Sequence, residues 1–222
     1  MISTSRALIG VMLFGAAVAC TAAGATSGPV PAPAIDLARP ATPGVQTVVV
    51  SGGCFWGIQA VFQHVRGVTH AISGYAGGEA STAHYEMVET GRTGHAESVQ
   101  ITYDPAVITY GQLLRVFFSV AHDPTELNHQ GPDDGPQYRS AIFFSTADEQ
   151  RVATAYIAQL DQAHVFPHPV VTAVTPLQGF FAAEDYHQDY ARLHPNDLYI
   201  MVNDAPKVTN LKREFPDLYR DR

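Results

Sequence analysis

The chain has 222 residues and a mass of 23.9 kDa, which is enough for one sizeable domain. It is 46% apolar and 15% charged, so it can bury a core, and its net charge of −8 argues against nucleic-acid binding. Its only cysteines are Cys20 and Cys54. Two thiols exclude a disulfide-rich miniprotein, a four-cysteine zinc site and a cysteine-ligated iron–sulfur cluster.

Residues 1–25 are predicted to be a signal peptide. Arg6 precedes an apolar run over residues 7–19, which is shorter than the roughly 20 residues that span a bilayer. Cleavage is expected either after Ala25, at a small-x-small site, or before Cys20, where the sequence resembles a lipobox and Cys20 would carry lipid. A buried N-terminal helix is the alternative. The chain is therefore expected to be exported, with a periplasmic location and membrane attachment through a lipid on Cys20 if that cysteine is modified.

Residues 26–44 are predicted to form a disordered spacer, because five prolines favour a stiff chain without secondary structure. These are Pro29, Pro31, Pro33, Pro40 and Pro43. Residues 45–222 show no internal repeat and no second linker. They are therefore predicted to form a single catalytic domain.

From residue 45 onward, apolar residues recur with the spacings of strands and helices. Strands are predicted over residues 45–50, 68–75, 96–103, 139–144 and 170–174. Helices are predicted over 54–65, 109–120, 146–163 and 183–193, the second and third opening with the capping boxes Thr109/Gln112 and Thr146/Glu149. Because some strands are consecutive and others alternate with helices, the pattern indicates an α+β fold, a mixed sheet with helices packed on it.

Cys54 is predicted to begin a helix directly after a strand and the Gly52-Gly53 turn. Unpaired N–H groups and the helix dipole at that position stabilise an anion, so a thiolate nucleophile is expected. Phe55 and Trp56 flank it and indicate an apolar aromatic site. A buried structural cysteine is the alternative.

Glu97 lies in a strand whose residues alternate strictly. It shares a face with Val99, Ile101 and Tyr103, so its carboxyl group is expected to point inward among apolar side chains. Burial favours the protonated form, which can act as a general acid at neutral pH. The alternative is an ion pair with Arg139. The ten histidines show no metal-ligand spacing, so no metal site is expected.

Seven ordered motifs cover nearly all of residues 45–190 and resemble those of A-type peptide methionine sulfoxide reductases. They are GCFWG at 53–57, GYAGG at 74–78, Tyr85 with TGHAE at 93–97, HDPT at 122–125, NHQGPD at 128–133, QYRS at 137–140 and FFAAEDYHQ at 180–188. The resemblance implies a ferredoxin-like core with additions. It also implies reduction of peptide-bound and free methionine S-sulfoxide, a repair of oxidised proteins.

The same resemblance implies roles for seven residues. Cys54 would attack the sulfoxide sulfur and become a sulfenic acid, while Glu97 would protonate the sulfoxide oxygen. Tyr85 and Tyr138 would also be catalytic, as phenols that hydrogen-bond the sulfoxide oxygen. The other three would bind the substrate: Phe55 and Trp56 as walls around the methyl group, and Asp133 as a supporting aspartate.

Two departures from the family pattern concern recycling and binding. No resolving cysteine follows Tyr199, so the sulfenic acid is expected to need an external thiol, from a thioredoxin-like protein or a small dithiol. Cys20 is the only internal alternative. His129 occupies a position where the family usually has Arg. No bound cofactor is expected, and the expected partners are oxidised proteins or peptides and the reductant.

Two other functions are compatible with parts of the pattern. A thiol hydrolase would need a histidine base aligned with Cys54, and none is evident. An exported binding module with a degenerate site is the other alternative, and the intact set of Cys54, Glu97, Tyr85 and Tyr138 argues against it.

Overall fold

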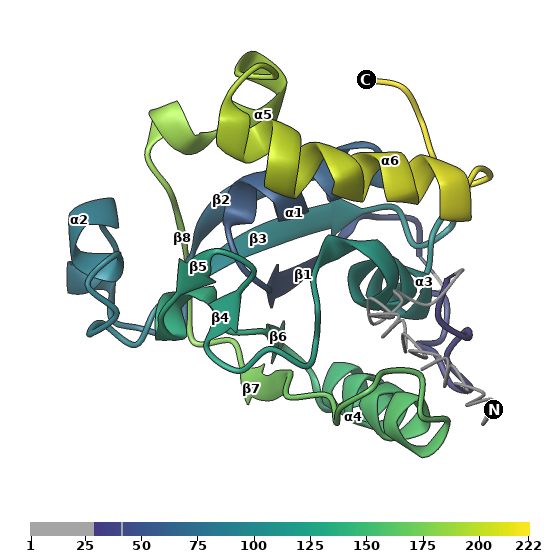
Figure 1. Ribbon diagram of the computed structural model, residues 1–222. Helices are drawn as coiled ribbons and strands as arrows, with labels where there is room; N and C mark the ends of the chain where they lie inside the picture. Colours follow the sequence, from purple (N-terminus) through teal and green to yellow (C-terminus); the bar gives the residue numbers. More distant parts are fainter. Residues whose placement is uncertain (1–28, 41) are drawn as a thin grey trace, which may run out of the picture.

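The computed structural model describes residues 29–40 and 42–222 (Figure 1). The strands are β1 (Gln46–Ser51), β2 (Val68–Ala76), β3 (Ala96–Tyr103), β4 (His129–Gln130), β5 (Asp133–Asp134), β6 (Ala141–Phe144), β7 (Ala173–Pro176) and β8 (Phe180–Ala182). The helices are α1 (Phe55–Gln63), α2 (Tyr85–Val88), α3 (Tyr110–Val116), α4 (Ala147–Gln162), α5 (Tyr190–Leu193) and α6 (Ala205–Glu214). Two π-helical turns, Phe117–Ala121 and Ile200–Asp204, follow α3 and precede α6.

The main sheet has six strands in the order β7-β6-β1-β3-β2-β8. Its central strands and two helices follow the chain order β1-α1-β2-β3-α3-β6, the ferredoxin-like β-α-β-β-α-β arrangement. Strand β1 pairs antiparallel with β3 and β6, whereas β7 pairs parallel with β6, so the sheet is mixed. The α+β class and the mixed sheet are therefore as the sequence predicts.

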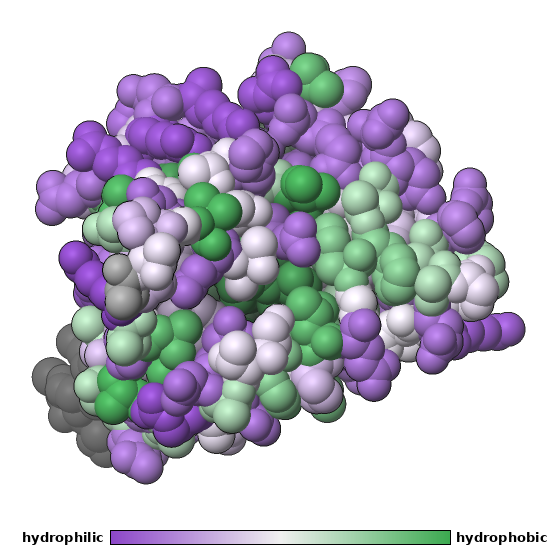
Figure 2. All heavy atoms as spheres, turned by 180° about the vertical axis from the view of Figure 1, so that it is seen from behind, coloured by the Kyte–Doolittle hydropathy of each residue, from purple (hydrophilic) through white to green (hydrophobic). Residues whose placement is uncertain are grey.

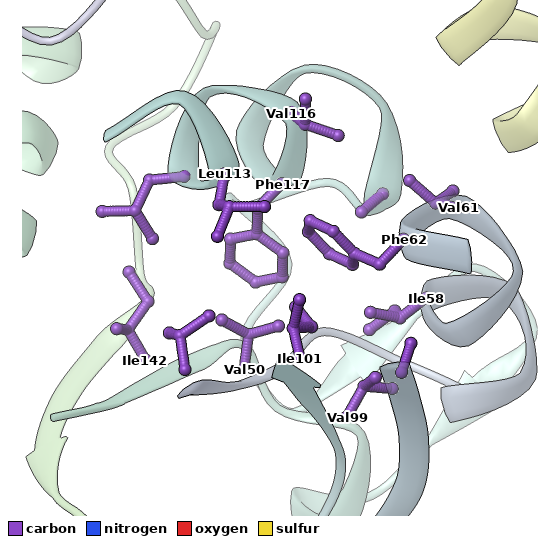
Figure 3. Close-up of a cluster of buried hydrophobic side chains, with 14 of the residues drawn as sticks. Val50, Ile58, Val61, Phe62, Val99, Ile101, Leu113, Val116, Phe117 and Ile142 are labelled. Carbon is purple, nitrogen blue, oxygen red and sulfur yellow. The ribbon is translucent and has the colours of Figure 1, made fainter. Parts of the chain in front are cut away.

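One face of this sheet carries the main hydrophobic core (Figure 3). Val50, Val99, Ile101 and Ile142 point from the strands toward the helices. Residues spaced by three and four along α1 meet them, and α3 closes the other side; the helix residues labelled there are Ile58, Val61, Phe62, Leu113, Val116 and Phe117. Burial of each large apolar side chain stabilises the fold by about 1.5–3 kcal/mol. This packing fixes the start of α1 against β3.

Most predicted elements lie within a few residues of their expected positions, and both capping boxes are present. The helix predicted over residues 183–193 is wrong. Asp189 has a left-handed backbone (φ 59°), and the Gln188 side chain bonds the N–H and carbonyl groups of Ser73 on β2. The segment is thus held against the sheet edge, and only the short helix α5 follows.

The disordered spacer predicted over residues 26–44 is wrong for residues 29–40, which lie in an extended path against α3 and α4. Val30 is only 2% exposed, its N–H donates to Ser119 Oγ at 3.1 Å, and Arg115 Nε donates to its carbonyl at 2.7 Å. Prolines suit this path because an extended polyproline conformation leaves the backbone carbonyls free to accept. Tyr156 donates to one of these carbonyls, that of Pro31, at 2.6 Å.

The proposed signal peptide and Cys20 lie outside the described residues. Within residues 29–40 and 42–222, no helix is long and apolar enough to cross a membrane.

Asp36 joins the N-terminal segment to the start of α3, and its removal should destabilise the protein. Its carboxylate accepts the N–H of Gly111 at 2.8 Å and the hydroxyl of Thr109 at 2.5 Å. We expect Asp36→Ala to lower the free energy of unfolding by about 1–2 kcal/mol, measured by denaturant titration. Asp217→Ala, at an exposed position, is the control and should change it by less than about 0.5 kcal/mol. Equal effects of the two substitutions would contradict this role.

Candidate active site

Cys54 follows the turn that joins β1 to α1 and occupies the N-cap position of the helix. Gly53 adopts a φ of 92° and donates its N–H to the carbonyl of Tyr138 at 3.0 Å. A Cβ atom at Gly53 would lie 2.5 Å from the side chain of Gln130. Both the backbone conformation and the close contact therefore require glycine immediately before Cys54.

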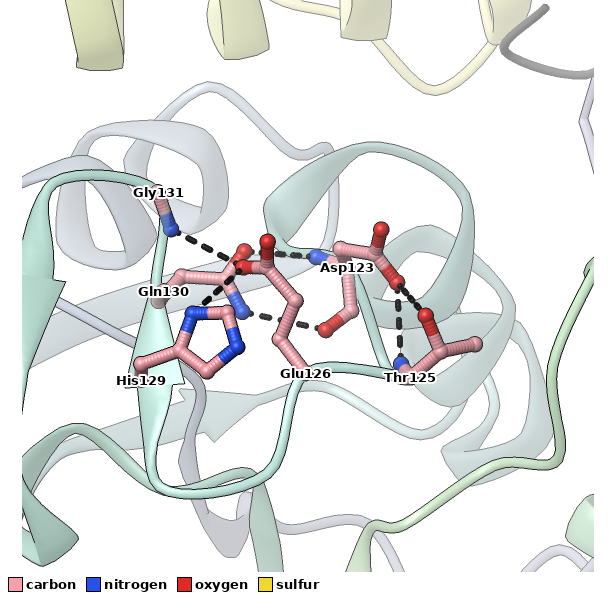
Figure 4. Close-up of polar contacts among 6 residues, drawn as sticks. All are labelled: Asp123, Thr125, Glu126, His129, Gln130 and Gly131. Atoms are coloured by element: carbon pink, nitrogen blue, oxygen red, sulfur yellow. Dashed lines mark hydrogen bonds and ion pairs between the residues drawn. The ribbon is translucent and has the colours of Figure 1, made fainter. Parts of the chain in front are cut away.

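The loop that supplies Gln130 is shaped by its own hydrogen bonds (Figure 4). Gln130 accepts the N–H of Asp123 at 2.8 Å and donates to the Asp123 carbonyl at 3.0 Å. Glu126 accepts the N–H of Gly131 at 2.9 Å and lies 3.7 Å from the exposed His129 ring. These bonds hold Gln130 over Gly53. The position where the family pattern has Arg is thus occupied here by a surface imidazole paired with Glu126.

The thiol of Cys54 is 8% exposed. Burial raises its pKa well above the ordinary value, and the charges of Glu97 and Asp204 raise it further. The backbone N–H of Trp56 and the ammonium of Lys207 act in the opposite direction and do not compensate. The expectation of a resting thiolate is therefore wrong: desolvation outweighs the helix N-terminus, and the resting group is a thiol.

Glu97 is 4% exposed and faces the start of α1 from β3. Its Oε2 accepts the N–H of Phe55 at 3.0 Å. Burial raises its pKa to about 8, so the carboxyl group is protonated at neutral pH, as the strand pattern predicts. The alternative of an ion pair with Arg139 does not hold, because that guanidinium donates to the backbone carbonyls of Gly94, His95 and Pro136.

Two tyrosines and an aspartate face the same centre. Burial and the charge of Glu97 raise the pKa of Tyr85 to about 12 and also raise that of Tyr138, so both phenols remain donors. The Tyr138 carbonyl accepts the N–H of Gly53, next to Cys54, and the Tyr85 ring lies 4.5 Å from that of His187, which also contacts Phe55. Asp133 accepts a hydrogen bond from the Tyr199 hydroxyl. These contacts bring both tyrosines to the start of α1, and Tyr199 links Asp133 to Trp56.

The indole of Trp56 is fixed on several sides. It stacks on Tyr190 with centroids 3.8 Å apart and an interplanar angle of 12°, and it meets Tyr199 edge-on at 6.0 Å. Its Nε1 donates to Nδ1 of His187 at 3.3 Å. Phe55 is only 1% exposed and packs beneath this cluster, with its ring 5.0 Å from that of His187. Trp56 thus forms an accessible wall and Phe55 lies under it.

Three aromatic residues at this site were not singled out from the sequence: His187, Tyr190 and Tyr199. His187 lies within the FFAAEDYHQ motif, but nothing in its spacing indicates contact with Trp56. Tyr190 lies in the segment over which a longer helix is predicted, and Tyr199 follows that segment. Only the tertiary fold brings that segment over α1.

His122 is a buried structural histidine. Its pKa is lowered to about 3, mainly by burial. Its Nδ1 donates to the carbonyl of Phe117 at 3.2 Å, and its Nε2 accepts from the Ser140 hydroxyl at 2.7 Å. Neither nitrogen is free to serve Cys54 as a base, which weakens the hydrolase alternative. In the described part of the chain, no group of three or more His, Cys, Asp or Glu side chains could hold a metal ion.

Comparison with known sequences agrees with this geometry. The family model for peptide methionine sulfoxide reductase matches residues 46–218. The chain is 57% identical over 182 residues to a Mesorhizobium japonicum protein named peptide methionine sulfoxide reductase MsrA 2, covering 82% of this chain and 93% of that protein. It is 44% identical over 175 residues to a Thermus thermophilus protein named peptide methionine sulfoxide reductase MsrA, covering 79% of this chain and 98% of that protein.

Solved structures are similar in fold. Mxr1 from Saccharomyces cerevisiae, in its reduced form, gives a TM-score of 0.61 at 31% identity, over 70% of this chain and 92% of that one. Methionine sulfoxide reductase A of Corynebacterium diphtheriae gives a TM-score of 0.59 at 33% identity, over 70% of this chain and 77% of that one. Fold and site therefore define a methionine sulfoxide reductase. The chain belongs to the peptide methionine sulfoxide reductase family, A type, whose activity is that of a peptide-methionine (S)-S-oxide reductase.

The raised pKa of Glu97 predicts that the free energy of unfolding falls as the pH rises. The unfolded carboxyl ionises near pH 4.5 and the folded one near pH 8, so its contribution to stability is fully present below pH 4.5 and lost as the pH rises toward 8. Glu97→Gln cannot ionise and should gain stability relative to the native chain between pH 4.5 and 8, on the order of a few kcal/mol. Denaturant titrations of both proteins at pH 4, 6 and 8 measure this; a difference that does not change with pH would contradict it.

Proposed function

We propose that this chain reduces peptide-bound and free methionine S-sulfoxide by attack of Cys54 on the sulfoxide sulfur, with Glu97 as the acid. The observation that carries the proposal is the buried Glu97 carboxyl group, protonated at neutral pH and bonded to the N–H of Phe55, the residue next to Cys54. A sulfoxide oxygen leaves sulfur readily only when it is protonated. An acid beside a thiol meets that requirement.

The proposed step balances in atoms and electrons. Cys54 attacks the sulfoxide sulfur as its thiol proton is lost, and the oxygen takes a proton from Glu97. A bond forms between the Cys54 sulfur and the substrate sulfur. The hydroxyl group then moves from the substrate sulfur to the Cys54 sulfur as the sulfur–sulfur bond breaks, so methionine leaves and Cys54 carries a sulfenic acid. Methionine sulfur gains two electrons and Cys54 sulfur loses two. The thiol proton restores Glu97.

The phenols of Tyr85 and Tyr138 support the same oxygen as hydrogen-bond donors, since their raised pKa values keep them protonated. Trp56 is the wall for the methyl group of the substrate, with Phe55 beneath it. Asp133 accepts a hydrogen bond from Tyr199 and so joins the β5 loop to the C-terminal segment beside Trp56.

We propose that an external thiol, from a thioredoxin-like protein or a small dithiol, regenerates Cys54. The first thiol attacks the sulfenic acid and releases water, and a second thiol resolves the mixed disulfide. The support is that Cys54 is the free cysteine of the described residues and that no cysteine follows it in the sequence. Oxidised proteins are the proposed substrates. Export through residues 1–25, with or without a lipid on Cys20, is likewise a proposal that rests on the sequence pattern.

The proposed reaction is tested with a diastereomeric mixture of methionine sulfoxide and dithiothreitol. The full chain should consume the S epimer only, Cys54→Ser should abolish the loss, and Glu97→Gln should slow it by about 10²–10⁴-fold. Chiral chromatography separates the epimers. Equal consumption of both epimers, or none, would overturn the proposal, and activity of Cys54→Ser would exclude Cys54 as the nucleophile.

The proposed intermediate is tested with one equivalent of methionine sulfoxide in the absence of thiol. Cys54 should become a sulfenic acid that dimedone traps, which mass spectrometry of the Cys54 peptide detects. The intact mass of the secreted protein in the same experiment identifies the cleavage site and any lipid on Cys20. A disulfide between Cys20 and Cys54 would instead contradict recycling by an external thiol.

A further inference from the structure

An ion pair buried behind the active-site helix is not used by the reaction described above. Lys207 Nζ lies 3.1 Å from Asp204 Oδ1, with the carboxylate fully buried and the lysine side chain 18% exposed. Asp204 occupies the N-cap position of α6, yet its side chain makes no capping bond there. Its Oδ2 has no hydrogen-bond partner. Aspartate at this position usually caps its own helix, but the Asp204 side chain does not cap α6.

The pair is directed toward the first turn of α1. A Cβ atom at Gly57 would overlap Asp204 Oδ1 and would lie 2.8 Å from Lys207 Nζ. Gly57 closes the GCFWG motif, three residues after Cys54. The absence of a side chain at Gly57 is what admits the carboxylate and the ammonium to the helix end that carries the nucleophile.

The charges at this helix end are unbalanced without Lys207. The positive end of α1 favours one anion, and Asp204 already lies against it. When Cys54 ionises during the reaction, a second negative charge forms at the same place. The titratable groups around Cys54 and Glu97 are Tyr75 of β2, Tyr85 of α2, Glu89 at the end of α2, Asp133 of β5, Tyr138 before β6, Tyr190 of α5, Tyr199 and Asp204 before α6, and Lys207 of α6. Lys207 supplies the positive charge in this set.

We propose that Lys207 is a positioning residue for the reaction: it neutralises Asp204 at the first turn of α1 and so permits Cys54 to become a thiolate there. The inference rests on the proposed role of Cys54 as the nucleophile. The directions of the electrostatic effects agree with it, since Asp204 raises the pKa of Cys54 and Lys207 lowers it. The C-terminal segment, which carries no resolving cysteine, thus contributes to catalysis through charge.

The test is the pH profile of Cys54 alkylation by iodoacetamide on the full chain. Mass spectrometry quantifies the Cys54 peptide separately from the Cys20 peptide. Lys207→Met should shift the midpoint upward by about one pH unit, which slows alkylation about tenfold at a fixed pH below it. Asp204→Asn should shift the midpoint downward, and the double variant should return it toward the native value. Lys212→Met is the matched control, because it removes an exposed ammonium from the same helix and should leave the profile unchanged.

The opposite signs separate an electrostatic role from a merely structural one, which would move all the variants in one direction. The double variant, which leaves no unpaired buried charge, keeps the test valid if Lys207→Met folds poorly. A Lys207→Met profile that matches Lys212→Met, or an upward shift in Asp204→Asn, would overturn the proposal. Sulfoxide reduction is measured in parallel. A native protein that is alkylated but reduces no sulfoxide would refute the proposed function, and the alkylation profiles of the variants would still decide whether Lys207 neutralises Asp204 beside Cys54.

Discussion

The rest of the site depends on one contact, the hydrogen bond from the Phe55 N–H to Glu97 at 3.0 Å. It joins the first turn of α1 to the middle of the sheet, so the proposed nucleophile and the proposed acid come from different elements and still meet. Neither group can move alone, because α1 and β3 share the main hydrophobic core. The same burial that fixes Glu97 also keeps it protonated, since its carboxyl group is almost completely removed from solvent. Geometry and protonation state thus have a single cause.

Close approach is the second condition, and glycine provides it. Gly53 lies under Gln130, and Gly57 lies against Asp204 and Lys207. Each glycine brings a polar side chain to within contact of the backbone that flanks Cys54. The two glycines of the GCFWG motif are therefore as necessary to the site as the cysteine and the aromatic residues between them, because a side chain at either position would prevent these contacts.

The sequence predicts the sheet and the principal helices well, because their signals are local. Strict alternation indicates β3 and the inward position of Glu97, and the capping boxes of Thr109 and Thr146 locate the starts of α3 and α4. The resting form of Cys54 is predicted wrongly. Position at a helix N-terminus is visible in a sequence, whereas the desolvation that outweighs it depends on packing from elements far along the chain.

The same reason explains the elements that were missed. Helix α6 is amphipathic, but its sequence is mostly polar, it buries only Leu211 and it carries Pro206 in its first turn, so it was not predicted. The extended segment over residues 29–40 is rich in proline, which is typical of disordered chains, but its carbonyls find donors on α3 and α4. In each case a partner distant in sequence decides the conformation.

The fixed position of Trp56 also has a spectroscopic meaning. It is the only tryptophan among the 222 residues, so all of the indole emission of the protein originates in one wall of the active site. That indole stacks on Tyr190 and donates to His187. The tryptophan emission of the protein, excited selectively so that its ten tyrosines do not contribute, is consequently an unlabelled optical probe of the surroundings of Trp56.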